Sequence, residues 1–337
     1  MTESEERKMT KEQVLESNSL KQRFIKDTKL PLNLLRNPYF EQRLNLYSNL
    51  YKDILDKWSS YLSMLEDFNS EQDYFEHYSS VKDGIIESVK GSEAYDRFNS
   101  IDMNGYAVPH QFRQLPSKDI FKPTFDHTEF ISIDMKKANF SSMSKYDPAI
   151  FSGCETWEEF VGQFTTYPHI INSKYIREAS LGNCNPKRHI TYEKYLMSVF
   201  LDEYVTYLES LDIESKIAFF SNDEVVFNVT DISKEQRYLM KSAVQVNIDT
   251  SIAPIELHVN EFRLYHISEL DGYLELNLDT NEIAPKSINN FMMPFLIRAM
   301  IGEEPKEEDM VFMHPNVSIL SKFLEAPVFT LPEELKL

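Results

Sequence analysis

The chain has 337 residues, and 42% of them are hydrophobic, which is enough for the core of one large domain or two ordinary ones. It carries 54 acidic and 35 basic residues, for a formal net charge of −19. This balance argues against a general, sequence-independent grip on nucleic acid, because such a grip needs many Lys and Arg side chains facing phosphates. No stretch has the apolar length of a membrane span or the pattern of a secretory signal. The two cysteines, Cys154 and Cys184, are too few for a disulfide framework, so a cytoplasmic protein is expected.

The N-terminal part of the chain predicts helices after a charged leader. Residues 1–28 are poor in large apolar groups, which predicts a mobile leader. From 29 to 125 we expect a helical region. Apolar and aromatic residues recur at three- and four-residue steps through 41–66 and through roughly 70–90, which predicts two amphipathic helices. Prolines punctuate 99–128, which is typical of an irregular connector.

Residues 126–250, together with the first strand after them, show a different pattern, in which strands and helices alternate. The expected elements, in chain order, are a strand at 129–134, helices that include 191–211, strands at 216–221 and 224–230, a helix opened by the capping box Ser233-Lys-Glu-Gln236 and ending near 246, and a strand at 254–259. This order predicts an α+β fold with a ferredoxin-like (β-α-β-β-α-β) sheet. The last part, 251–337, predicts a small β-rich region.

The elements expected in that last part are few. They are strands at 262–267 and 273–278, joined by an Asp271-Gly272 turn, and a helix around 288–301 with Pro294 inside it.

Carboxylates mark the ends of two of the predicted strands. The first strand ends at Asp134, and the turn between the second and third strands holds Asp223 and Glu224. A right-handed crossover leaves a slot beside the first strand that the third strand fills in antiparallel orientation, so the three acids should meet. Without a cation they would repel one another, and Mg²⁺ or Mn²⁺ with the carbonyl of Met135 would resolve this. Ordinary turn chemistry also places Asp and Asn at such positions.

Two short segments carry a resemblance to known enzymes. The segment Ile131-Ser-Ile-Asp-Met-Lys-Lys-Ala-Asn-Phe140 resembles the first catalytic motif of palm-domain polymerases. The segment Ser221-Asn-Asp-Glu-Val-Val-Phe-Asn-Val-Thr-Asp231 resembles the Ser-x-Asp-Glu hairpin of translesion (Y-family) DNA polymerases. Together they cover about twenty residues. The resemblance implies a palm-type nucleotidyltransferase in which Asp134, Asp223 and Glu224 bind two Mg²⁺ ions.

The residues after Asp134 bear on the choice of sugar. In polymerases of this kind the fifth position after the first Asp usually carries a bulky side chain that excludes the ribose 2′-hydroxyl. Here that position is Asn139, whose amide can hydrogen-bond a hydroxyl, and we expect ribonucleotides to be accepted. A register shift of one residue would place Phe140 there instead.

Basic residues near the predicted site are candidates for binding the triphosphate. Lys187 and Arg188 lie in a loop before the long helix, where a helix N-terminus also favours phosphate, and Lys174 and Arg177 extend the same strip. A solvated polar loop is the alternative. Lys136 and Lys137 would neutralise incoming phosphates or face water. Cys184 and His189 lack the orienting carboxylate of a nucleophile–base pair.

The expected function is metal-dependent nucleotidyl transfer on a nucleoside triphosphate, with a nucleic-acid primer or template that a partner protein would deliver and no membrane partner. One alternative is a non-catalytic acidic binding or scaffold protein, such as a viral or phage accessory protein of the host-cell cytoplasm. Another is a palm-fold nucleotide cyclase or a tRNA-end nucleotidyltransferase. The template, the direction of synthesis and the oligomeric state are left open by the sequence.

Overall fold

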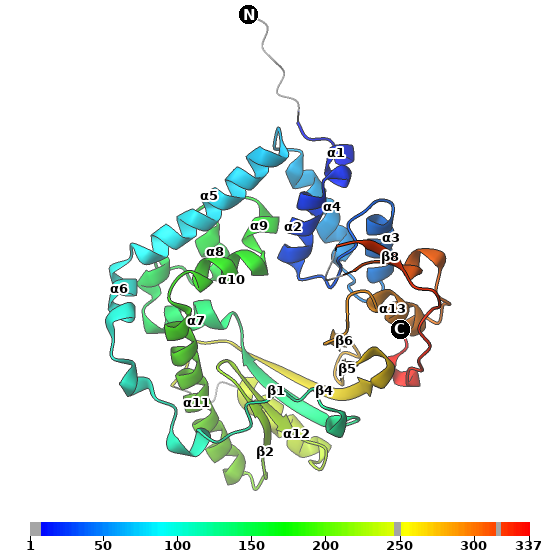
Figure 1. The fold of residues 1–337 in the computed structure, drawn as a ribbon. Coiled ribbons are helices and arrows are strands. Elements are labelled where there is room, and N and C mark those ends of the chain that lie inside the picture. Colours follow the sequence, from blue (N-terminus) through cyan, green and yellow to red (C-terminus); the bar gives the residue numbers. More distant parts are fainter. Residues whose placement is uncertain (1–7, 246–250, 315–317) are drawn as a thin grey trace, which may run out of the picture.

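The computed structural model describes residues 8–245, 251–314 and 318–337, and these form a mixed α+β structure (Figure 1). Its centre is a six-stranded antiparallel sheet in the order β2-β3-β1-β4-β5-β6. The strands are β1 Glu129–Met135, β2 Lys216–Phe220, β3 Glu224–Asn228, β4 Leu257–Ile267, β5 Gly272–Asn277 and β6 Ile283–Lys286. A separate hairpin joins β7 Val311–Met313 to β8 Leu320–Lys322. In the described part of the chain, no helix has the length and apolar character needed to cross a membrane.

Strand β1 lies between β3 and β4 and is antiparallel to both. Asp134 is opposite Glu224 of β3 and opposite His258 of β4. The predicted adjacency of the first and third strands is therefore confirmed. The two predicted strands at 254–259 and 262–267 are wrong, since β4 runs unbroken through Asn260 and Glu261. These polar residues do not interrupt the strand, because both pair across to β1 and Glu261 forms ion pairs with Arg237 and Lys241 of the helix that precedes β4.

The two faces of the sheet are covered differently. Ile131 and Ile133 belong to the main core, which the helices of the crossovers cover. Those helices include α7 Ala138–Tyr146, α11 Pro186–Ser210 and α12 Lys234–Gln245. On the other face, Phe130, Val226 and Phe262 form a small separate cluster. Because successive side chains of a strand point to opposite faces, Asp134 shares the face of Phe130, beyond the end of that small cluster.

The N-terminal region is helical, as expected, but it begins earlier. Its helices are α1 Lys11–Glu16, α2 Asn18–Thr28, α3 Tyr39–Tyr47, α4 Ile54–Leu65, α5 Glu71–Lys90 and α6 Glu93–Ser100. The prediction of a mobile leader is wrong for α1 and α2, because Leu20 and Phe24 are buried in the core. Residues 1–7 of that leader lie outside the described residues. The predicted helix at 41–66 is interrupted between α3 and α4, although both pieces keep their apolar side chains in the core.

The C-terminal region contains a buried helix as well as strands. Helix α13, Met293–Met300, has Pro294 in its first turn, so the expected longer helix with an internal proline is wrong. A proline is tolerated there because its missing N–H would have no partner in the helix. Arg298 of α13 and Arg43 of α3 share the buried carboxylate of Asp309, at 2.9 and 2.6 Å. The expected boundary at 250 and the helix end near 246 lie outside the described residues.

Figure 1 shows the resulting arrangement. The helices from α2 to α6 form an arch that starts beside α13 and returns toward α7 and α11 at the sheet. Three shorter helices, α8 Trp157–Val161, α9 Pro168–Ile171 and α10 Lys174–Gly182, lie inside this arch. Contacts of α10 with α2 and α5 hold it there. The arch therefore places α10 opposite the ends of the central strands.

Candidate functional site

The ends of β1 and β3 are joined by backbone hydrogen bonds that fix the predicted acids next to one another. The N–H of Met135 donates to the carbonyl of Asp223 at 2.9 Å, directly beside the Asp134–Glu224 pair. The turn before β3 is held by Ser221, whose N–H donates to the carbonyl of Glu224 at 2.8 Å and whose Oγ accepts from the N–H of Glu224 at 3.1 Å. The three acids therefore sit on a rigid backbone frame.

Negative charge accumulates at these strand ends. Burial raises the pKa of Glu224 to about 7, and the neighbouring charges of Asp134, Glu275 and Asp223 act in the same direction. Burial also raises the pKa of Asp223, and Asp134 adds to this shift, while a hydrogen bond from Ser221 opposes it. The carboxylate of Asp134 contacts Nδ1 of His258 at 3.1 Å. Carboxylates placed so close together favour a bound cation or a bound proton.

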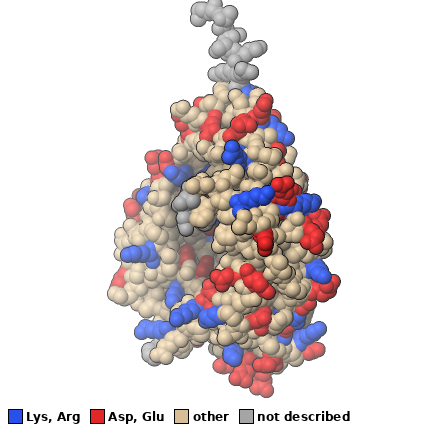
Figure 2. All heavy atoms as spheres, turned by 45° about the vertical axis from the view of Figure 1, so that its right-hand side comes forward, with Lys and Arg blue, Asp and Glu red and all other residues tan. Residues whose placement is uncertain are grey.

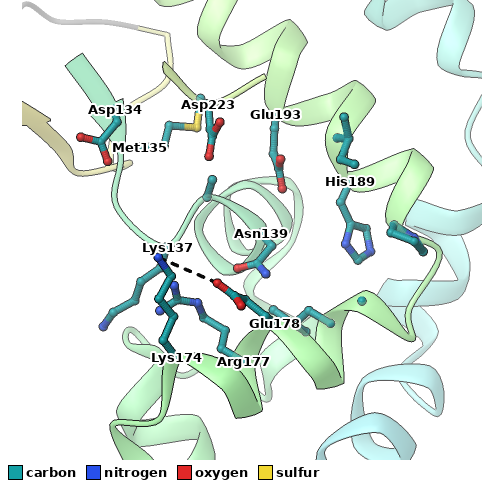
Figure 3. Close-up of a pocket in the computed structure, with 15 residues that line it drawn as sticks. Asp134, Met135, Lys137, Asn139, Lys174, Arg177, Glu178, His189, Glu193 and Asp223 are labelled. Carbon is teal, nitrogen blue, oxygen red and sulfur yellow. Dashed lines mark ion pairs between the residues drawn. The ribbon is translucent and has the colours of Figure 1, made fainter. Parts of the chain in front are cut away.

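The side chains of these acids are not drawn together around one point. Within the described ranges, no group of three or more His, Cys, Asp or Glu residues is arranged to hold a metal ion. Figure 3 shows the carboxylate of Asp223 extending toward the pocket beside Glu193, while Asp134 lies to the side of Met135 at the end of β1. The backbone has therefore brought the acids to one place, but their carboxylates do not form a closed set of ligands.

A pocket of about 380 Å³ opens beside Asp134 and Asp223. We call it the strand-end pocket. Its other walls come from the start of α7, from α10 and from the first turns of α11 (Figure 3). Helix α10 contributes Lys174 and Arg177, and the charge of Lys174 is near enough to Asp223 to lower the pKa of that carboxyl. The pocket thus has acids on its strand side, while its α10 side carries two cations and the carboxylate of Glu178.

The residues that follow Asp134 divide between this pocket and other surroundings. Lys137 and Asn139 line it, and Lys137 also forms an ion pair with Glu158. Lys136 is absent from its walls and pairs instead with Glu256. Phe140 is buried against Phe151, with 4.6 Å between the ring centroids. Asn139, not Phe140, therefore occupies the position facing the pocket.

The expected role of Lys187 and Arg188 is not supported by their positions. Neither side chain lines the strand-end pocket. The guanidinium of Arg188 donates to the backbone carbonyls of Phe98 and Ile101, at 3.2 and 2.7 Å, and Lys187 is exposed. The cause is the start of α11. The helix begins at Pro186 rather than near 191, and residues 186, 189, 190 and 193 then share the face toward the pocket, while 187 and 188 face elsewhere.

That face of α11 brings in two residues that the sequence did not single out as site residues. Glu193 accepts a hydrogen bond from the Asn222 amide at 2.8 Å, and burial raises its pKa to about 7, with Asp223 adding to the shift. His189 is buried, and within the described ranges its Nε2 has no hydrogen-bonding partner. The spacing of four between His189 and Glu193 is the sequence signal that would have grouped them, once the start of the helix is known.

The cation at the wall formed by α10 is also incompletely paired. The Nε of Arg177 is buried and has no hydrogen-bonding partner in the described part of the chain, and burial lowers the pKa of this side chain. Lys174 lies 3.9 Å from Glu178 and is more than half exposed. An anion entering the pocket would therefore find donors on α10 that the protein itself leaves unsatisfied.

A second hollow adjoins the strand ends on the far side of Asp134. It is a groove of about 850 Å³ between residues 49–53 and strands β4–β6, and its walls include His258 and Glu275. Acidic and basic side chains are interspersed over the face drawn in Figure 2, and a hollow opens near the centre of that face. The acids of the strand ends therefore stand between two concave regions.

Neither the models of known protein families nor the curated proteins match this chain. The candidate site is accordingly described by geometry alone: acids at the ends of two paired strands face Lys174 and Arg177 of α10 across one pocket.

Proposed function

We propose that this chain catalyses metal-dependent nucleotidyl transfer in the strand-end pocket, in the manner of a palm-type polymerase. The strand order β2-β3-β1-β4, with α7 to α11 inserted between β1 and β2 and α12 between β3 and β4, supports a ferredoxin-like palm. The observation that carries the proposal is that Asp134, which pairs with Glu224 in the sheet, lines the pocket together with Asp223, across from Lys174 and Arg177. Glu224 lies next to Asp134 and is not itself one of the lining residues.

The donor set fits a hard divalent cation. Asp134, Asp223 and Glu224 offer carboxylate oxygens, which Mg²⁺ and Mn²⁺ prefer. Burial, and after it the charges of neighbouring acids, raises the pKa values of Asp223 and Glu224, and a bound cation would favour their charged forms. The carbonyl of Met135 would complete the set. When bound, the metal would neutralise charge on the transferring phosphate and on the attacking and leaving oxygens.

The protein's other groups would bind and orient the nucleotide. Lys137, Lys174 and Arg177 would hold the phosphates, and Asn139 would hydrogen-bond the sugar. No nucleophilic serine or cysteine lines this pocket among the described residues, so the attacking group would be a hydroxyl of the substrate. The contribution of the chain is then position and charge, which together account for most of the catalysis in phosphoryl transfer.

The direct test is incorporation of labelled NTPs or dNTPs with Mg²⁺ or Mn²⁺, with and without DNA and RNA primers. The test variant is Asp223→Asn, and the matched control is Asp231→Asn, which changes an exposed acid of the same segment. We expect the test variant to lose about 100-fold or more of the activity, because one preorganised charge at such a site is worth that much, and the control to keep it.

Three outcomes would change the proposal. Incorporation that is equal in the wild type and in Asp223→Asn would show that the acids of the strand ends take no part in the reaction. No turnover of any nucleotide, with either metal and any primer, would favour a binding or scaffold protein. Release of pyrophosphate from an NTP without an acceptor would keep the site and assign it to cyclisation.

A further inference from the structure

The strand-end pocket has two chemically different ends. Lys174 and Arg177 lie at one side of it with Glu178 beside them, and His189 lies at the opposite side, with Asn139 between the two sides (Figure 3). Leu181, Pro186 and Ile190 complete the wall near His189, so this end is mostly apolar. The volume of about 380 Å³ is typical of pockets for small organic ligands. A matching ligand carries negative charge at one end and an apolar, hydrogen-bonding group at the other.

His189 is built into the wall as an unsatisfied group. It is only 3% exposed, and its ring packs against Phe98 with 6.0 Å between the ring centroids. Its Nε2 has no hydrogen-bonding partner among the described residues, although His189 lines the pocket. A buried polar atom without a partner destabilises the fold, so one that belongs to a residue lining a cavity points to a group that arrives with the ligand.

The protonation state of the His189 imidazole indicates whether its partner on the ligand is a hydrogen-bond donor or an acceptor. Burial lowers the pKa of His189 to about 4, so the imidazole is neutral near pH 7. A hydrogen bond with the backbone of Cys184 opposes this shift, which identifies its backbone partner as an acceptor. The ring proton therefore sits on Nδ1, and Nε2 carries a lone pair. The missing partner is a hydrogen-bond donor.

We propose that His189 is a specificity-determining residue that accepts, at Nε2, a hydrogen bond from the nucleoside part of a bound nucleotide. This inference rests on the proposed function, because it takes the ligand to be a nucleoside phosphate with its phosphates toward Lys174 and Arg177. The donor is an N–H of the base or a hydroxyl of the sugar. The pocket then recognises the base or the sugar of the nucleotide in addition to its phosphates.

Binding measured by calorimetry separates the two ends of the ligand. The probes are ATP, CTP, GTP, UTP and inorganic tripolyphosphate, with Ca²⁺ in place of Mg²⁺ to slow turnover, and the full chain is used. For His189→Phe we expect at least one nucleotide to bind about 10-fold more weakly or worse, while tripolyphosphate binds as before. His189→Gln should restore most of the affinity, because its side-chain carbonyl provides an acceptor near the position of Nε2.

A second measurement keeps the test valid if the phenylalanine variant folds poorly. On the wild type, analogues of the preferred nucleotide that lack one donor, such as its 2′-deoxy form or a base without its amino group, are compared with the parent. Removing one of these donors from the nucleotide should weaken its binding to the wild type but have no further effect on its binding to His189→Phe. Additive losses for every analogue would overturn the assignment.

The remaining outcomes distinguish this inference from the function beneath it. Nucleotide binding that depends on His189, without any incorporation, would leave the inference standing and refute nucleotidyl transfer. Incorporation with nucleotide affinities unchanged by His189→Phe would refute the inference alone. Equal weakening of tripolyphosphate and nucleotides in His189→Phe and His189→Gln would also refute it, since a structural role would produce that result. No binding of any nucleotide to the wild type would overturn both.

Discussion

The ends of β1 and β3 and the first turns of α11 border the same pocket, but different interactions place their side chains. At the strand ends, a ladder of backbone hydrogen bonds sets Asp134 against Glu224, and the order of the strands is enough to predict this pairing. In α11, the residue at which the helix begins decides which side chains face the pocket. Predicting the start near 191 instead of at Pro186 singled out Lys187 and Arg188, and it missed Glu193.

The difference shows that pairing between strands is more robust to small errors in element boundaries than the facing of a helix. A strand shortened by two residues still pairs in the same register. A helix turns by about 100° per residue, so an undetected first turn hides the side chains that it presents. The following predictions ask whether the acids of the strand ends and the side chains of α10 and α11 carry the separate roles that this comparison gives them.

The largest effect is expected at the strand ends. Asp134→Asn and Asp223→Asn should each reduce nucleotide incorporation by about 100- to 1,000-fold, because each removes a charge from the same proposed set of metal ligands. The double variant should be little worse than either single one, since residues that act as a unit lose their effect together. Rates under single-turnover conditions measure this. Multiplicative losses would show that the two acids act independently, against a shared site.

The next effect concerns the cations. Arg177→Met should weaken tripolyphosphate binding by about 10- to 100-fold, because a hydrogen bond from a charged donor in a buried pocket is lost. Lys187→Met is the matched control, and it should bind tripolyphosphate as the wild type does, since its side chain is exposed and outside the pocket. Calorimetry compares the two. If both variants lost tripolyphosphate affinity equally, the start of α11 would bind the triphosphate as α10 does, and the comparison would fail.

A smaller effect is expected from Asn139, which faces the pocket where Phe140 does not. Asn139→Tyr should shift the ratio of ribonucleotide to deoxyribonucleotide use by about 10-fold toward deoxyribonucleotides, because the ring would crowd the 2′-hydroxyl. Phe140→Tyr is the control at the neighbouring position. Competition between the two kinds of nucleotide gives the ratio directly. Unchanged selectivity in Asn139→Tyr would remove this residue from sugar recognition.

The smallest effect is a difference in pH dependence between Glu224 and Glu193, whose pKa values are both raised to about 7. A carboxyl whose pKa is higher in the folded state stabilises the fold fully below its unfolded pKa, and that stability is lost as the pH rises through the folded value. Without metal, the free energy of unfolding should therefore fall between about pH 4.5 and pH 8, and Glu224→Gln and Glu193→Gln should each flatten the curve.

Divalent metal separates these two acids. Each glutamate contributes part of the fall in the free energy of unfolding with rising pH. Mg²⁺ should reduce the contribution of Glu224 and leave that of Glu193 unchanged, because only Glu224 belongs to the proposed ligand set. Urea unfolding at several pH values, with and without Mg²⁺, measures both. If Mg²⁺ acted equally on the two variants, the metal would not distinguish the strand end from α11.

The sequence by itself determined the local features and those that depend on strand order. The alternation of strands and helices predicted the α+β class and the antiparallel neighbour of β1. The pattern Ser-Lys-Glu-Gln predicted the capping box of α12, in which Ser233 and Gln236 exchange hydrogen bonds at 3.2 and 3.3 Å. These predictions succeed because each depends on neighbours along the chain or on the handedness of a connection.

The tertiary structure alone decided how the helices meet the sheet. It packed α1 and α2 into the core, carried β4 through Asn260 and Glu261, and placed Arg177 and His189 on opposite sides of the strand-end pocket. Each of these features depends on partners far away in the chain, so residues close by in the sequence do not determine it. The acids of the strand ends were therefore predictable, while the groups that face them were set by long-range packing.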